Sequence, residues 1–128
     1  MSLELWKEHT ITLNNYKKVT VLDNAIVWRT LIDSGVMSYK DLCEQCNKSK
    51  SEVSKTLKVS LMPYLVRSCL ARKKDSLSTN SAYMIFQVYE KLDEVNFAEF
   101  LHKVIDENLN RSEIEDLKKT VLKKVSTN

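Results

Sequence analysis

The sequence predicts an all-α fold, a compact multi-helix domain that contains a helix-turn-helix. Three observations lead to this prediction. Only one Gly and one Pro occur in 128 residues, too few for the many tight turns of a β-sandwich or barrel. Apolar residues recur at helical spacing in segment after segment. Residues that cap helix N-termini stand before most of these segments.

The first predicted helix follows a lead-in over residues 1–20. Residues 9–13 alternate like a short strand, but a lone strand has no partner, so we expect an irregular or partly helical segment. From 22 to 34 the apolar residues, among them Ala25, Trp28 and Leu31, recur with a helical period. Gly35 then stands where a helix ends with a positive φ.

Two short helices are predicted next, over residues 38–46 and 50–62. Ser38 caps the first, with Asp41 in its first turn. Asn47, which tolerates the left-handed conformation, ends it. Ser49 and Glu52 have the spacing of a capping box, and Pro63 stops the second helix near Met62.

Four further helices are predicted over residues 64–73, 79–92, 97–109 and 113–125. Ser78, Asn96 and Ser112 are the expected N-caps of the last three, with Glu99 completing a capping box with Asn96. No repeat or low-complexity linker interrupts the chain. We therefore expect one helical domain over residues 21–128.

Charge is distributed unevenly along the chain. The formal net charge is only +3. Residues 48–74 hold eight basic residues against Glu52 alone, a net charge of +7, whereas residues 75–117 carry a net charge of −7. A concentrated basic segment allows a protein of modest charge to present a positive face to a polyanion, although a solvated basic helix would show the same charge.

The helix pair over residues 38–57 has the dimensions of a helix-turn-helix. Apolar side chains needed on its inner side are present at the expected positions, with free cysteines acting as small hydrophobes: Leu42, Cys43, Cys46, Val53 and Leu57. The outer side of the second helix then carries short polar and basic groups that suit base edges or phosphates in a major groove: Lys50, Ser51, Ser54, Lys55 and Lys58. Helix N-termini also favour phosphate, which adds Tyr39 and Lys40. The turn residues Lys48 and Ser49 complete the candidate set.

The segment Lys48-Ser49-Lys50-Ser51-Glu52-Val53-Ser54-Lys55-Thr56-Leu57, continued to Pro63, resembles the DNA-binding core of ParB/KorB-type plasmid and chromosome partition proteins. The run 40–43, the pair 77–78 and Ala82 extend the resemblance over about residues 22–92. It implies binding to centromere or operator DNA on an inverted repeat, a homodimer, and a partition ATPase as partner of the full-length protein. It also implies that 49–61 is the recognition helix and that later basic residues contribute: Arg67, Arg72, Lys73 and Lys74.

Several classes of function are disfavoured. No Gly-rich phosphate loop or Gly-x-Ser-x-Gly motif occurs, so we expect no enzyme and no cofactor. Cys43 and Cys46 form a single Cys-x-x-Cys motif without further ligands at zinc spacing, so we expect no metal. The apolar runs are too short to span a membrane, and three cysteines fit a reducing cytoplasm.

Two alternatives to a partition protein remain. A stand-alone transcriptional repressor would carry the same helix-turn-helix. A helical protein-interaction module would instead use the acidic C-terminal half, between residues 93 and 116, as its binding surface.

Overall fold

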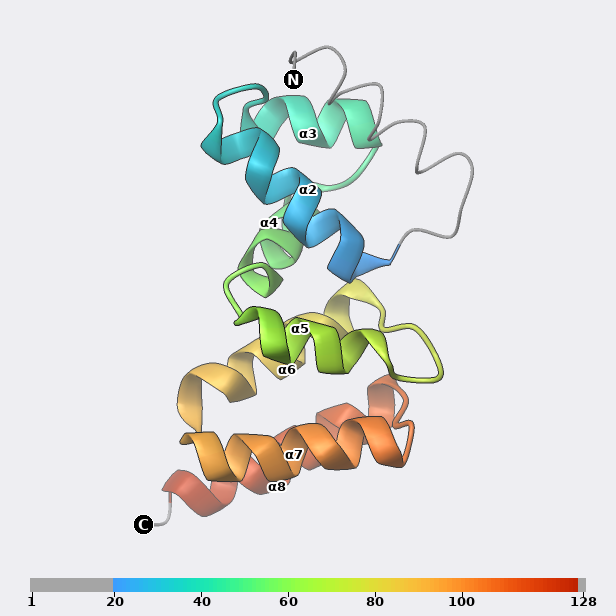
Figure 1. The fold of residues 1–128 in the computed structure, drawn as a ribbon, viewed down its shortest axis with the longest axis vertical. Helices are drawn as coiled ribbons and strands as arrows, with labels where there is room; N and C mark the ends of the chain where they lie inside the picture. Colours follow the sequence, from blue (N-terminus) through green and yellow to red (C-terminus); the bar gives the residue numbers. More distant parts are fainter. Residues whose placement is uncertain (1–19, 127–128) are drawn as a thin grey trace. The chain divides into compact units, whose positions relative to one another are not determined.

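The structure, a computed structural model, describes residues 20–126, with side chains as far as Lys124. The predicted lead-in, apart from Thr20, lies outside the described residues. Every regular element in residues 20–126 is helical, as predicted (Figure 1). The helices are α2 (Val21–Asp33), α3 (Tyr39–Cys46), α4 (Lys50–Val59), α5 (Tyr64–Ala71), α6 (Thr79–Lys91), α7 (Glu94–Asp106) and α8 (Arg111–Ser126).

The N-terminal caps agree with the sequence in the first part of the chain and differ later. Ser38 and Asp41 form a complete capping box at α3, and Ser78 caps α6. The expected cap Asn96 is wrong, because α7 begins after Asp93, whose side chain accepts from the Asn96 N–H at 2.8 Å. Ser112 is wrong as well, since Asn110 and Glu113 form the reciprocal pair at α8, both bonds being 2.9 Å.

Three helices end in the same way, with a left-handed residue after the last turn. Gly35 (φ 76), Asn47 (φ 53) and Asn108 (φ 47) have positive φ. In each case the next residue donates its N–H to a carbonyl five residues earlier, at 3.0 Å. Asn47 and Asn108 can end these helices because asparagine, with its short polar side chain, adopts the left-handed conformation more readily than other non-Gly residues do.

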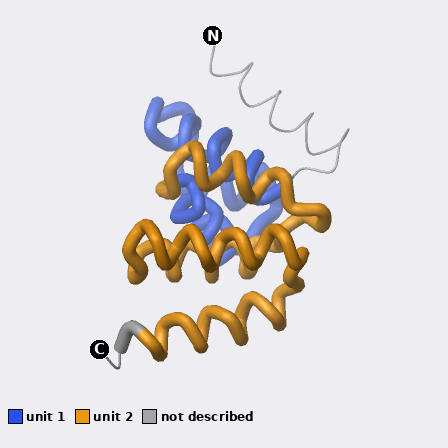
Figure 2. The backbone as a smooth tube through the Cα atoms, turned by 60° about the horizontal axis from the view of Figure 1, so that its bottom comes forward, with its two compact units in different colours: residues 1–60 blue, residues 61–128 orange. Residues whose placement is uncertain are grey.

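The chain divides into two compact units, unit 1 (Met1–Ser60) and unit 2 (Leu61–Asn128), coloured separately in Figure 2. The sequence predicts one domain over 21–128, whereas the contacts between residues group into two units with a boundary after Ser60. Composition does not reveal this boundary, because no Gly-, Ser- or Pro-rich linker marks it. α4 also ends at Val59 rather than near Met62.

Unit 1 is built around a small apolar core. α2 and α3 both pack on α4. The buried cluster comprises Trp28, Leu31, Met37, Leu42 and Val53. Cys43, Cys46 and Leu57 pack against it, half-buried, so the inner residues predicted for the helix pair are confirmed.

Unit 2 centres on α6, which contacts both α7 and α8, while α7 also contacts α5. Buried apolar side chains from these helices form its core, including Ile85, Phe86, Phe100, Val104 and Ile114. Tyr89 and Phe97 meet edge to face, with ring centroids 5.3 Å apart. Among the described residues, no helix has the length and apolar character needed to cross a membrane.

Candidate nucleic-acid interface

The connection between α3 and α4 is short and extensively hydrogen-bonded. Asn47, in the left-handed conformation, closes α3, and the Lys48 N–H reaches the Cys43 carbonyl at 3.0 Å. The Ser49 hydroxyl accepts from the Glu52 N–H at 3.1 Å. Tyr39 in the first turn of α3 donates its hydroxyl hydrogen to the Lys50 carbonyl. The start of α4 is therefore oriented by contacts on both sides of the turn.

Glu52 departs from the predicted capping box. Its carboxylate lies 3.3 Å from the Lys48 ammonium, one helical turn away, and the structure shows only the Ser49 half of the box. Lys48 is thus paired with the single acidic residue of the basic segment. Its exposed side chain still lies at the turn, where the sequence predicts it.

The far end of α4 is bound by Arg29 of α2. The Arg29 guanidinium donates to the Leu57 carbonyl and to the Ser60 hydroxyl, both at 3.0 Å. These bonds join residues 28 and 31 positions apart, and no local pattern in the sequence predicts them. A cation at the C-terminal end of α4 also interacts favourably with the helix dipole.

The two faces of α4 differ as the sequence predicts. Val53, Thr56 and Val59 are buried, and the Thr56 hydroxyl donates to the Glu52 carbonyl at 2.8 Å. Thr56 was not among the predicted inner residues, because a hydroxyl needs this intrahelical acceptor to be buried at low cost. Of the predicted outer residues, three are exposed (Lys50, Ser51 and Lys58) and two are half-buried (Ser54 and Lys55).

The N-terminal end of α3 contributes the remaining predicted residues of unit 1. Lys40 is exposed and Tyr39 half-buried. Ser49 caps α4 through its hydroxyl, so its side chain has a structural role at the turn.

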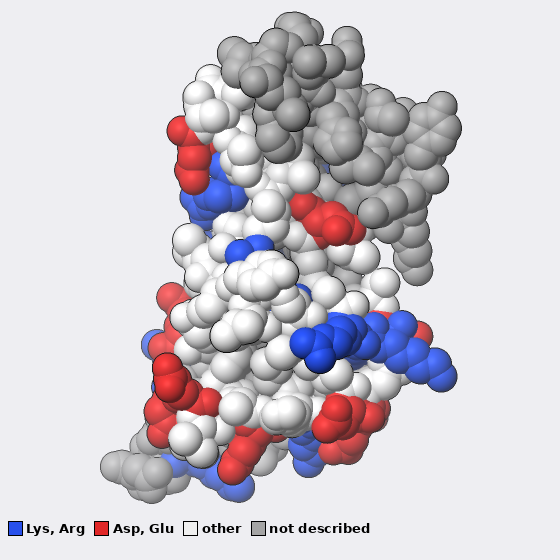
Figure 3. Space-filling view, in the orientation of Figure 1, with Lys and Arg blue, Asp and Glu red and all other residues white. Residues whose placement is uncertain are grey.

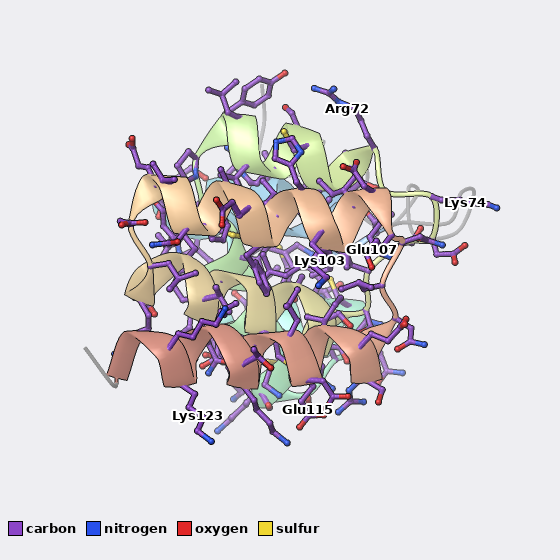
Figure 4. The ribbon with its side chains drawn as sticks, turned by 90° about the horizontal axis from the view of Figure 1, so that it is seen from below. Arg72, Lys74, Lys103, Glu107, Glu115 and Lys123 are labelled. Carbon is purple, nitrogen blue, oxygen red and sulfur yellow. The ribbon has the colours of Figure 1, made fainter. Side chains whose placement is uncertain are left out.

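The later basic residues lie in unit 2 and differ from one another. Arg67 donates to the Met62 carbonyl at 3.0 Å, and its guanidinium lies 5.9 Å from the Tyr64 ring centroid. Arg72 and Lys74 are exposed and project outward from the loop after α5 (Figure 4). Figure 3 shows basic surface beside the end of this helix.

Lys73 does not fit the predicted role in phosphate binding. Its side chain is buried, with 8% of the residue exposed. The ammonium donates to the Asp75 carbonyl at 3.1 Å and to the Asn108 Oδ1 at 3.0 Å. The spacing of charges along the chain cannot show that the middle one of these three consecutive basic residues turns inward, because its acceptor Asn108 lies 35 residues away.

Cys43 and Cys46 are free thiols on the inner side of α3. Burial raises the pKa of the Cys46 thiol, while the nearby Lys48 ammonium acts in the opposite direction. No group of three or more His, Cys, Asp or Glu side chains is placed to hold a metal ion within residues 20–126.

A groove of about 370 Å³ lies elsewhere, between α7 and α8 of unit 2. It contains none of the predicted site residues. Apolar and polar residues line it in equal number: Leu92, Asn96, Glu99, Phe100, Lys103, Leu117, Val121 and Lys124.

No family model, curated protein or solved structure matches the chain.

Proposed function

We propose that unit 1 binds double-stranded DNA sequence-specifically, with α3 and α4 acting as a helix-turn-helix and α4 entering the major groove. The observation that carries the proposal is the support of α4 at both ends. Tyr39 and the Asn47 turn orient its beginning, and Arg29 binds its end. The helix so positioned exposes Lys50, Ser51 and Lys58.

The chemistry of these exposed groups suits both kinds of DNA contact. Lysine donates to guanine O6 and N7 or to phosphate oxygens, and the serine hydroxyl bonds to either. Lys50 and Ser51 stand in the first turn of α4, where free N–H groups and the helix dipole favour an anion. Lys40 at the start of α3 provides a second such position.

The resemblance to ParB/KorB-type proteins supports a role in plasmid or chromosome partition, with a centromere or operator as the target. In that role the chain would act as a homodimer on an inverted repeat, beside a partition ATPase. A stand-alone repressor would use the same contacts at a promoter, so the recovered DNA site distinguishes the two.

Selection from random duplexes at two salt concentrations tests the proposal. We expect an inverted-repeat motif to be enriched, with log K falling linearly with log salt concentration because phosphate binding releases counterions. Absence of binding at low salt would refute the assignment of α4. It would direct attention to proteins that bind the acidic C-terminal half.

A matched pair of double variants separates specific contacts from overall charge. Lys50→Ala with Lys58→Ala removes two exposed lysines of α4, and Lys91→Ala with Lys119→Ala removes two exposed lysines of unit 2. The first pair is expected to weaken binding to the selected duplex at least about tenfold, since base contacts contribute about 1–3 kcal/mol each. The second pair should change it little. Equal losses would mean that only net charge matters.

A further inference from the structure

Asn108, at the corner between α7 and α8, makes three side-chain hydrogen bonds. It ends α7 with φ 47, and the Leu109 N–H reaches the Val104 carbonyl at 3.0 Å. Its side chain is not used for this closure. It extends instead to the loop that follows α5, more than thirty residues earlier in the chain.

Both polar atoms of the Asn108 amide are bonded to that loop. The Oδ1 accepts from the Lys73 ammonium and from the Asp75 N–H, each at 3.0 Å. The Nδ2 donates to the Asp75 carboxylate at 2.7 Å. Lys73 also donates to the Asp75 carbonyl at 3.1 Å. Four hydrogen bonds therefore join Lys73, Asp75 and Asn108, which we call the Asn108 network.

The Asn108 network restrains the loop strongly because Lys73, at its centre, is a buried residue. An unpaired buried charge is costly, so Lys73 favours the loop conformation that brings it to Asn108 Oδ1. The Arg72 and Lys73 backbone N–H groups are also bonded to the end of α5, to Cys69 and Leu70 respectively, at 3.1 Å. The loop is thus fixed from both sides.

Arg72 and Lys74 flank the buried lysine and are exposed. Their side chains project away from the helices of unit 2 (Figure 4). Two cations carried on a fixed backbone lose less conformational freedom on binding than two cations on a free loop. This is the arrangement required of a preorganised phosphate contact.

We propose that Asn108 is a positioning residue for DNA binding, and that it acts through Lys73 and Asp75 to hold Arg72 and Lys74 against the phosphate backbone. The inference rests on the proposed function of α4 and adds a second contact region to it. Asn108 itself touches no DNA in this arrangement. Lys73 supplies the internal bond rather than a phosphate contact.

Asn108→Gly is the most direct test, because Gly keeps the left-handed backbone at low cost and removes only the side chain. Affinity for the selected duplex is measured at several salt concentrations. We expect a several-fold weaker affinity, and the slope of log K against log salt concentration should become shallower by about 0.9 to 1.8, as one or two phosphate contacts are lost. No cation near the DNA has been removed, so a change in slope reports positioning. A loss of stability alone would lower the active fraction and leave the slope unchanged.

Two comparisons complete the test. The Arg72→Ala/Lys74→Ala variant gives the salt slope expected when the proposed phosphate contacts are absent. Adding Asn108→Gly to that variant should not change its affinity or its slope any further. Asn96→Ala is the matched control and should behave like wild type, because Asn96 is an exposed asparagine of α7 and the substitution retains the backbone N–H that donates to Asp93. If Asn108→Gly does not fold, Asp75→Ala takes its place, because it removes the carboxylate that accepts from the Asn108 Nδ2 and removes no cation, so a shallower slope again reports positioning.

An unchanged slope in Asn108→Gly, or an equal additional loss in the Arg72→Ala/Lys74→Ala background, would overturn the inference. Failure of the proposed function itself is distinguishable. In that case the Lys50→Ala/Lys58→Ala variant would bind the duplex as wild type does. If that variant loses binding while Arg72→Ala/Lys74→Ala does not, α4 binds DNA and the second contact is refuted.

Discussion

Replacing Arg29 by Met tests how α4 is supported within unit 1. The substitution retains an apolar stem of similar length and removes the guanidinium. Two hydrogen bonds are lost, those to the Ser60 hydroxyl and the Leu57 carbonyl, both 3.0 Å long. The ion pair with Asp33, at 3.9 Å between side chains that are 33% and 65% exposed, contributes little because it is solvated.

The expected loss of stability follows from these contacts. Hydrogen bonds from a charged donor contribute about 1.5–3 kcal/mol when buried. The Arg29 side chain is one-third exposed, which lowers the contribution of each hydrogen bond. In the variant the Leu57 carbonyl still accepts from the Ser60 N–H at 3.2 Å, so it is not left without a partner. We expect Arg29→Met to lower the free energy of unfolding of unit 1 by about 1–2 kcal/mol.

Urea denaturation followed by Trp28 fluorescence is the appropriate assay, because Trp28 is buried in the core of unit 1. The only other tryptophan is Trp6, so a Trp6→Phe background makes Trp28 the sole reporter. Asp33→Ala is the control and should shift the free energy by less than about 0.5 kcal/mol. An Arg29→Met value that equals the control would refute the assigned role of the guanidinium.

Three further predictions concern unit 1 and use the same assay. Gly35→Ala should cost about 1–2 kcal/mol, because a Cβ at φ 76 is strained although no atom lies within 4 Å of it; a Gly35→Asn variant that fares no better would contradict this explanation. Leu42→Ala should cost about 2–5 kcal/mol, since Leu42 is fully buried, while Leu42→Met should cost less than about 1.5 kcal/mol; equal losses would show that cavity formation is not the cause. Because burial raises the pKa of Cys46 above its ordinary 9.0, the unfolded chain loses this proton first. The free energy of unfolding should therefore fall as the pH rises above about 9. Cys46→Ala should show a smaller fall between pH 8 and pH 10, and parallel curves for the two proteins would disprove the linkage.

Much of the helical architecture can be predicted because its signals are local. A cap and the N–H group it satisfies lie within three residues, as for Ser38 and Asp41. The left-handed ends at Gly35 and Asn47 depend on the residue at that position. The inner face of α4 follows from the helical period alone. Before α7 and α8 several polar residues could serve as the N-cap, so the local signal is ambiguous. Both helices therefore begin a few residues earlier than the sequence predicts.

The basic segment illustrates what composition can and cannot decide. The concentration of positive charge over residues 48–74 is a property of the sequence. Whether each cation faces solvent depends on groups distant in the chain. Arg72 and Lys74 remain exposed, whereas Lys73 is bound by Asn108. Identical residue types in adjacent positions therefore have different roles.

By itself, the sequence determined the all-α class, most helix positions and the exposed cations of α4, since these depend on periodicity, caps and charge within a few residues. Only the tertiary structure decided the support of α4 by Arg29, the inward position of Lys73 and the separation of the chain at Ser60. The physical reason is that such contacts join residues about thirty positions apart. A hydrogen bond at that separation depends on which helices pack against one another, and no pattern within a few residues of the sequence specifies that choice.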